Sequence, residues 1–216
     1  MRVGEEQLCG RNGRRRGAGC TLRAPLPSAA RTGAPEAGPP APGDGVNEVT
    51  RFAMLARSGD RVALAAFIRG TQPDVWRLCS HLGGPAEADD LTQETYLRAL
   101  PALARFRGDS NARTWLLCIA RRTVADHIRS AQRRRRLHGS LPTPTDTHDA
   151  AQDSEVDLML GGLEPDRRTA FVLTQMLGLS YAEAADVCGV PVGTIRSRVA
   201  RARTHLVEAL RTEVAE

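Results

Sequence analysis

The sequence of residues 179–206 predicts a short helix, a tight turn and a second helix, at a spacing that few other folds require. Ser180 and Glu183 have the S-x-x-E spacing of a capping box, which starts a helix. Gly189 stands where a left-handed residue ends a helix, and Pro191 fixes the backbone at the entry to the next helix. Because the first helix also carries several alanines, the two helices can cross closely, and the segment predicts a helix-turn-helix unit.

The second helix, expected from Pro191 to about Leu210, separates apolar from polar side chains. At about 100° per residue, one apolar stripe collects Ile195, Val192, Val199, Ala202 and Leu206. The opposite face has no acidic residue before Glu208 and presents Gly193, Thr194, Ser197 and Arg201, flanked by Arg196 and Arg198. Arginine donates two bonds to guanine or to phosphate, and small side chains permit close approach, so this face predicts DNA binding. A basic helix that meets only solvent is the alternative interpretation.

Composition excludes several other classes of protein. The chain has 216 residues, and all 30 of its basic residues are arginine. Aromatic residues make up only 4% and no period-two alternation appears, so we expect an all-α fold. No apolar run approaches the roughly 20 residues of a membrane span, and the first residues lack the apolar core of a secretory signal. The five cysteines form no CxxC pair or Cys/His metal spacing, so we expect a cytoplasmic protein with no disulfide scaffold, metal site or cofactor.

Charge and composition divide the chain into four segments. Residues 1–45 hold 9 Gly and 6 Pro and are expected to be disordered. They are a dispensable tail, the result of a start codon assigned too far upstream, or an arginine-rich arm that binds nucleic acid. Residues 46–136 carry a net charge of +7 in a helical pattern, and residues 137–152 are rich in Pro, Thr and Asp, as linkers are. Residues 153–216 form the second domain, so we expect two small helical domains joined by a flexible linker.

Apolar spacing predicts four helices in the first domain. They are expected at 61–69, from Pro73 to a stop at Gly83, at 86–104 with Pro101 kinking or ending the helix, and from about Asn111 to Arg133 with Asp109 or Ser110 as the cap. In the second domain, helices at 154–160 and from Pro165 to Gly178 precede the helix-turn-helix unit.

An acidic patch in the predicted third helix is one candidate binding surface. Asp90 and Glu94 lie one turn apart beside Gln93, in an otherwise basic domain. The patch either docks a basic partner or is simply solvated. Paired carboxylates also occur in acid–base catalysis, but no nucleophile, metal set or phosphate loop accompanies them, which excludes that interpretation.

The arginines of the predicted fourth helix give it a basic face. Such a face suits a single nucleic-acid strand, which also needs a stacking platform or pocket for its bases. Trp115 is either that platform or a core residue of the apolar stripe. Asp126 and His127 also have interpretations without a binding role: Asp126 pairs with Arg122 or Arg129 one turn away, and His127 is an ordinary surface histidine. The candidates to line a base pocket are Asn111, Thr123, Asp126 and His127.

Four segments of the chain resemble the extracytoplasmic-function (ECF) sigma factors of bacteria, in that family's order. DDLTQETYLRAL (89–100) is similar to sigma region 2.2, and FRGDSNARTWLLCIARRTVADHIR (106–129) is similar to regions 2.3 and 2.4. MLGLSYAEAADVCG (176–189) resembles the first helix of region 4.2, and VPVGTIRSRVARAR (190–203) resembles its recognition helix. The resemblance spans about residues 50–210 and is greatest to the sigma C type of actinobacteria.

The resemblance implies a non-catalytic, dissociable subunit of RNA polymerase that directs promoter-specific initiation. The first domain would bind the β′ coiled coil of core polymerase and read and open the −10 element. The second would read the −35 element and contact the β flap, with an anti-sigma factor as a further partner. The polymerase-binding residues that it implies are Asp89, Asp90, Leu91, Gln93, Glu94 and Leu97. Those for the −10 element are Asn111, Arg113, Trp115, Arg121, Arg122, Thr123, Asp126, His127 and Arg129, and those for the −35 element are Ser180, Tyr181, Gly193, Thr194, Arg196, Ser197, Arg198, Arg201 and Arg203.

Two other classes of function are weaker. A helix-turn-helix regulator, such as a response-regulator effector domain, would explain residues 165–210 but not the basic helix at 111–136 or the acidic linker. An enzyme would need a set of residues with catalytic spacing, which the sequence lacks. Binding to core RNA polymerase, rather than to duplex DNA alone, distinguishes a sigma factor from such a regulator.

Overall fold

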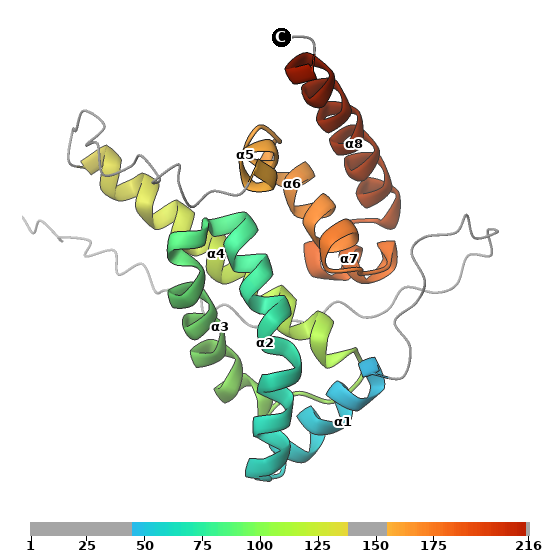
Figure 1. Cartoon of the computed structure of the whole chain (residues 1–216). Coiled ribbons are helices and arrows are strands. Elements are labelled where there is room, and N and C mark those ends of the chain that lie inside the picture. The colour runs from blue at the N-terminus through green and yellow to red at the C-terminus, as the bar shows by residue number, and fades with distance from the viewer. Residues whose placement is uncertain (1–44, 138–154, 215–216) are drawn as a thin grey trace, which may run out of the picture. The chain divides into compact units, whose positions relative to one another are not determined.

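The structure is a computed structural model that describes residues 45–137 and 155–214. Every regular element in those ranges is a helix, which confirms the expected all-α fold (Figure 1). The first range contains α1 (Gly45–Arg57), α2 (Arg61–Gly83), the 3₁₀ turn η1 (Pro85–Glu87), α3 (Ala88–Leu103) and α4 (Ala112–Leu137). The second contains α5 (Glu155–Gly161), α6 (Pro165–Phe171), the π-helical turn η3 (Val172–Met176), α7 (Tyr181–Cys188) and α8 (Val192–Val214). The predictions for the tail and the linker lie outside the described residues.

Four helices of the first range pack around a shared apolar core, with α2 and α3 side by side in Figure 1. Its largest fully buried side chains are Phe67, Val75, Leu78, Leu116 and Leu117. Burying one such side chain stabilises the fold by about 1.5–3 kcal/mol. In both described ranges, no helix is long and apolar enough to cross a membrane.

The helix α2 runs straight through Pro73, so the expected break between two helices at that point was wrong. Phe67, Thr71, Val75 and Leu78 are all buried and follow one another at helical spacing, on both sides of the proline. Pro73 itself is exposed, so its ring meets solvent rather than a neighbouring helix. Packing along the whole stripe offsets the roughly 3 kcal/mol that an internal proline costs a helix.

Two further details of the first domain differ from the predictions. The helix α1 was not among the four expected helices, although its Phe52 and Ala53 pack into the core. Asn111, rather than Asp109 or Ser110, caps α4, because its Oδ1 accepts a hydrogen bond from the backbone N–H of Arg113 at 3.0 Å. Asn, Asp and Ser are nearly equal as caps, so residue type alone did not decide among them.

The second range builds the helix-turn-helix unit around buried apolar residues that include Leu160, Leu173, Ile195 and Val199. The predicted capping box is present: the backbone N–H of Glu183 donates to Ser180 Oγ at 3.2 Å, and the N–H of Ser180 donates to Glu183 Oε2 at 2.9 Å. Gly189 has the predicted left-handed conformation, with a φ of 68°.

The predicted apolar stripe of α8 is buried at Ile195, Val199 and Ala202, and Leu206 is half-buried. Val192 was expected in the same stripe but is 40% exposed. It is the first residue of α8 and lies about 60° from the centre of the stripe, so it stays outside the packed surface.

Candidate nucleic-acid and polymerase interfaces

The outward face of α8 presents the residues predicted to bind DNA. Gly193, Arg196, Ser197 and Arg201 are exposed, and Thr194 is half-buried. Ser197 Oγ donates to the carbonyl of Thr194 at 3.0 Å and keeps its lone pairs toward solvent. Within the described residues, neither Arg196 nor Arg201 has an ion pair or a side-chain hydrogen bond, so both guanidinium groups are available to a ligand.

The other two arginines of this set are engaged inside the domain. Arg198 forms an ion pair with Asp166 of α6, and Arg203 Nη2 donates to Gln175 Oε1 at 2.6 Å. These contacts hold α8 against α6 and η3. Arg198 and Arg203 therefore have a structural partner that a DNA contact would have to replace.

Ser180 and Tyr181, at the start of α7, complete the predicted −35 set. The Ser180 hydroxyl is occupied in the capping box, where it also donates to Glu183 Oε2 at 2.8 Å. Tyr181 is half-buried against the core. Both residues fix the start of the first helix of the unit, where the capping box already engages the backbone N–H of Ser180.

The residues predicted for the −10 element divide between the two sides of α4. Arg122, Asp126 and Arg129 are exposed, whereas Asn111, Arg113, Trp115, Arg121 and His127 are half-buried. Thr123 is 1% exposed and donates to the carbonyl of Ile119 at 3.1 Å, so its hydroxyl lies inside the domain. The exposed basic surface continues through the run 133–136 at the end of the helix.

Three of the half-buried residues have well-defined partners in the first domain. Arg113 Nε donates to Asp74 Oδ2 at 2.6 Å, which ties α4 to α2. The ring of Trp115 lies 5.1 Å from that of Phe106, and His127 Nε2 lies 3.7 Å from Glu87 Oε2. Trp115 therefore combines a core contact with partial exposure.

Asp126 joins two helices through charged hydrogen bonds. Its carboxylate accepts hydrogen bonds from Arg129 Nη2 at 2.6 Å and from Arg98 Nη1 of α3 at 2.8 Å. The pairing with Arg129 is one of the two that helical spacing predicted. Arg129 first, and then Arg98, hold the pKa of Asp126 below its ordinary value. Arg98 also donates to Glu94 Oε1 at 2.7 Å. Sequence spacing gave no signal for Arg98, because it lies 28 residues from Asp126.

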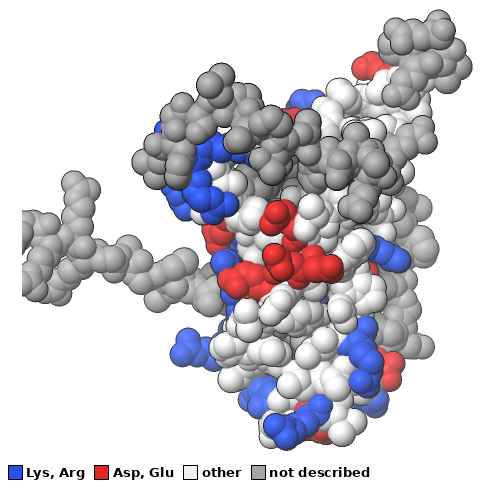
Figure 2. All heavy atoms as spheres, turned by 60° about the vertical axis from the view of Figure 1, so that its left-hand side comes forward, with Lys and Arg blue, Asp and Glu red and all other residues white. Residues whose placement is uncertain are grey.

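The acidic surface of α3 contains four of the six predicted polymerase-binding residues in exposed positions. Asp89, Asp90, Gln93 and Leu97 are exposed, and Glu94 is half-buried beside Arg98. Figure 2 shows acidic side chains gathered on the face that it brings forward, the side of α3 in Figure 1. Asp89 also accepts a hydrogen bond from the indole Nε1 of Trp76 at 2.8 Å, a contact that sequence reasoning missed.

Leu91 differs from the other members of this set. It is only 4% exposed and packs against α2, where it would clash with a Cβ placed on Gly83. Its side chain therefore lies inside the domain and not on the acidic surface. Among the described residues, no group of three or more His, Cys, Asp or Glu side chains is arranged to hold a metal ion.

Two family models match the two described ranges of the chain. The family model of Sigma-70 region 2 matches residues 67–134, and that of Sigma-70, region 4 matches residues 153–206. The chain is 53% identical over 165 residues to the ECF RNA polymerase sigma factor SigC of Mycobacterium tuberculosis, covering 74% of this chain and 89% of that protein. The probable RNA polymerase sigma-C factor of Mycobacterium bovis matches to the same extent.

Two solved structures have the same fold. The sigma factor RpoE, crystallised with the anti-sigma factor NepR from Bartonella quintana, has a TM-score of 0.60 and 30% identity, covering 68% of this chain and 96% of that one. CnrH, in complex with the cytosolic domain of CnrY, has a TM-score of 0.60 and 26% identity, covering 76% of this chain and 98% of that one. The chain therefore belongs to the ECF group of the sigma-70 family, the sigma factors with which RNA polymerase initiates transcription at specific promoters.

Proposed function

We propose that the two domains divide the promoter between them. The first domain reads and opens the −10 element, and the second reads the −35 element as duplex DNA. The chain acts as a non-catalytic subunit that leaves phosphoryl transfer to the core enzyme. The proposal rests on the unengaged guanidinium groups of Arg196 and Arg201 beside Ser197. Arg201 lies on the face of α8 away from its buried stripe, and Arg196 flanks that face.

The chemistry of this face favours the major groove. An arginine that donates two bonds to guanine discriminates against other bases by about 1–3 kcal/mol. Gly193 at the start of α8 removes a side chain where the backbone must approach the DNA, and nothing lies within 4 Å of the position that its Cβ would take. A helix presented by its first turns is the usual arrangement of helix-turn-helix proteins on DNA.

For the −10 element, we assign strand binding to the exposed basic side of α4. Arg122 and the run 133–136 supply positive charge along the helix, and partly exposed Trp115 offers an aromatic edge close to the helix start. A single strand needs both features, since its phosphates bind cations and its bases stack. Asn111, Asp126 and His127 are the polar candidates for an unstacked base.

For polymerase docking, we assign the acidic surface of α3 to the β′ coiled coil. Asp89, Asp90 and Glu94 present carboxylates around exposed Leu97, a combination that suits an arginine-bearing helix with some apolar surface. The β flap is the proposed partner of the second domain, by family resemblance. An anti-sigma factor is the proposed inhibitory partner, since RpoE was crystallised with one.

Reconstitution tests these assignments. The full chain is mixed with core RNA polymerase and a library of promoter fragments, and run-off transcripts are sequenced. We expect transcripts only when the chain is present, from templates with one shared −10 and one shared −35 sequence. Equal transcription from all templates, or duplex binding with no association with core polymerase, would contradict the proposal.

A further inference from the structure

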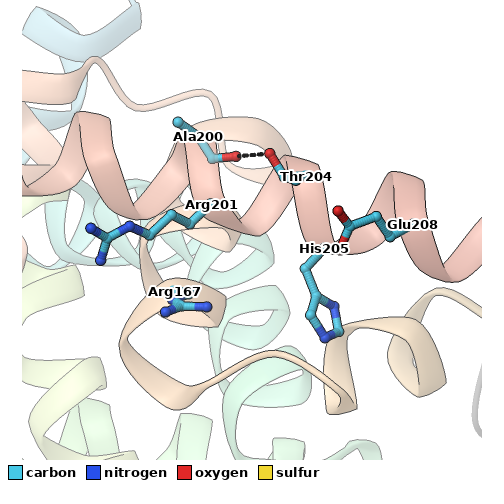
Figure 3. Close-up of a pocket in the computed structure, with 6 residues that line it drawn as sticks. All are labelled: Arg167, Ala200, Arg201, Thr204, His205 and Glu208. Carbon is cyan, nitrogen blue, oxygen red and sulfur yellow. Dashed lines mark hydrogen bonds between the residues drawn. The ribbon is translucent and has the colours of Figure 1, made fainter.

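A hollow lies between α6 and the second half of α8, away from the first turns of α8. Its volume is about 320 Å³, and its lining residues are Arg167, Ala200, Arg201, Thr204, His205 and Glu208. Figure 3 shows Arg201 and His205 pointing from α8 to the side on which Arg167 of α6 lies. The family resemblance named Arg201 but neither Arg167 nor His205.

The charge of the hollow is unusual for a surface depression. Two permanently charged guanidinium groups and one imidazole face it, against the single carboxylate of Glu208. Within the described residues, Arg201 and His205 have no ion pair or side-chain hydrogen bond, whereas Arg167 Nε forms a long ion pair with Glu164 Oε2 at 3.9 Å. The two guanidinium groups and the imidazole outnumber the one carboxylate that lines the hollow, and this excess of positive charge favours an anion in the space that they share.

The donors around the hollow match a phosphate group. Each guanidinium offers paired N–H donors, an imidazole offers one in either protonation state, and such charge-assisted bonds are strongest to phosphate and carboxylate oxygens. Thr204 does not compete for the arginines, because its hydroxyl donates to the carbonyl of Ala200 at 3.2 Å. We propose that this hollow is a binding site for a phosphate group.

The position of the hollow favours a phosphate of the DNA backbone, an inference that rests on the proposed function. Arg201, Thr204 and His205 lie at about 240°, 180° and 280° from Ile195, on the same side of α8 as Ser197 at about 200°. Arg196 and His205 are separated by about 13.5 Å along the helix axis, close to the roughly 12 Å width of the major groove. A helix whose first turns read bases therefore brings its third turn, together with Arg167, to a phosphate at the edge of the groove.

The ion pair between Arg198 and Asp166 keeps this geometry in place. It fastens the residue before Arg167 to α8, so that the two sides of the hollow stay together.

The test compares Arg167→Gln and His205→Gln with Arg211→Gln, which removes an exposed arginine of α8 outside the hollow. The full chain, alone and with core RNA polymerase, is titrated onto labelled promoter DNA between 50 and 200 mM salt. Log affinity falls with log salt, and one lost phosphate contact makes this fall less steep by about 0.9. The ratio of wild-type to Arg167→Gln affinity should therefore shrink about 3.5-fold across this range. Preference among −35 sequences should stay unchanged, and Arg211→Gln should behave as the wild type.

A second arm separates DNA from a small phosphorylated molecule. Inorganic phosphate is titrated into the ¹⁵N-labelled full chain at constant ionic strength, with chloride as the reference, and the His205 ring signals are followed. If phosphate shifts the His205 ring signals in the wild type but not in Arg167→Gln, the hollow binds phosphate. If the salt dependence of DNA binding is also the same in both proteins, the site is assigned to a free phosphate and not to DNA. Unchanged slopes together with no response to phosphate would overturn the proposal. Failure of the wild-type chain to direct promoter-specific transcription by core RNA polymerase would instead refute the proposed function.

Discussion

The guanidinium of Arg98 donates to the carboxylate of Asp126, with 2.8 Å between Nη1 and Oδ2, although the two residues lie on different helices. Arg98 also holds Glu94, so one side chain connects the proposed docking surface of α3 with the proposed −10 surface of α4. A polymerase residue that displaces Arg98 from Glu94 would therefore change the surroundings of Asp126 as well.

Replacing Arg98 with Gln should raise the pKa of Asp126 toward its ordinary value of 3.8, while Arg129 still keeps it low. Because the folded-state pKa lies below the unfolded value, the ionised carboxylate stabilises the fold above pH 4, and this contribution disappears as the pH falls through the lower, folded pKa. Asp126 is 48% exposed, so the change in stability should stay below about 1 kcal/mol. A pH titration of the carboxyl ¹³C signal measures the shift, with exposed Arg105→Gln as the control. An unaltered Asp126 titration in Arg98→Gln would refute the coupling.

Reversing Asp90 and Glu94 to Arg should weaken binding to core RNA polymerase by about tenfold or more, since like charges then face the coiled coil. Calorimetry or a pull-down with core polymerase measures the loss. Glu48→Arg is the matched control, because Glu48 is an exposed carboxylate on α1, apart from the docking surface. If the double variant and the control bind equally well, the acidic surface of α3 is not the docking site.

Replacing Gly189 with Ala should destabilise the second domain by about 1–2 kcal/mol, the cost of a left-handed residue with a Cβ. No atom lies within 4 Å of the Cβ position, so the cost is that of backbone conformation and not of a clash. Gly189→Asn should cost less, because asparagine tolerates this conformation. Urea unfolding compares the two variants. Equal stability of the alanine and asparagine forms would show that the turn relaxes to another conformation.

Alanine at Arg196, Ser197, Arg198 or Arg201 should relax preference at a single −35 base pair for at least one of the four, by about 1–3 kcal/mol. Arg196 is the leading candidate, because Arg198 is engaged with Asp166 and Arg201 faces the hollow proposed for a phosphate. Transcription in vitro from a −35 variant library measures the preference, while binding to core polymerase and −10 opening stay intact. A uniform loss across the library in all four variants would mean that α8 contacts only the DNA backbone.

The thiol of Cys79 should be almost unreactive at neutral pH, because burial raises its pKa to about 11. At pH 8 only about one thiol in a thousand is then ionised, and the thiolate is the reactive form. In a chain whose other four cysteines are replaced by Ser (Cys9, Cys20, Cys118 and Cys188), a disulfide reagent should modify Cys79 slowly in the native state and fast in urea. The same raised pKa means that stability from the neutral thiol is present below pH 9 and lost as the pH rises toward 11. Rapid native modification would indicate frequent opening of the first domain.

Local patterns predicted the second domain better than the first. The capping box of Ser180 and Glu183, the left-handed Gly189 and the stripe through Ile195 depend on neighbours within one or two turns, so the sequence shows them directly. Pro73 misled the prediction for α2, since burial on both sides of it is a property of the tertiary structure.

The contacts that shape the candidate surfaces were the least predictable. Arg98 with Asp126, Trp76 with Asp89 and Arg198 with Asp166 each join residues more than ten positions apart, and no periodicity relates them. The residue types of the surfaces could be predicted, since exposed arginines and carboxylates follow from helical spacing. Which of these side chains stay available and which are held by a partner could be learned only from the fold.

The hydrogen bond from Trp76 to Asp89 makes Trp76 an internal NMR reporter of the state of Asp89. The chain has only two tryptophans. Trp76 is 41% exposed beside the proposed docking surface, and Trp115 lies against Phe106. Grown with 5-fluorotryptophan, the protein would give two ¹⁹F resonances, which remain visible against an unlabelled polymerase. Engagement of Asp89 by the polymerase would move the Trp76 resonance, and strand capture at the −10 element would move that of Trp115, so the order of the two events can be followed in one sample.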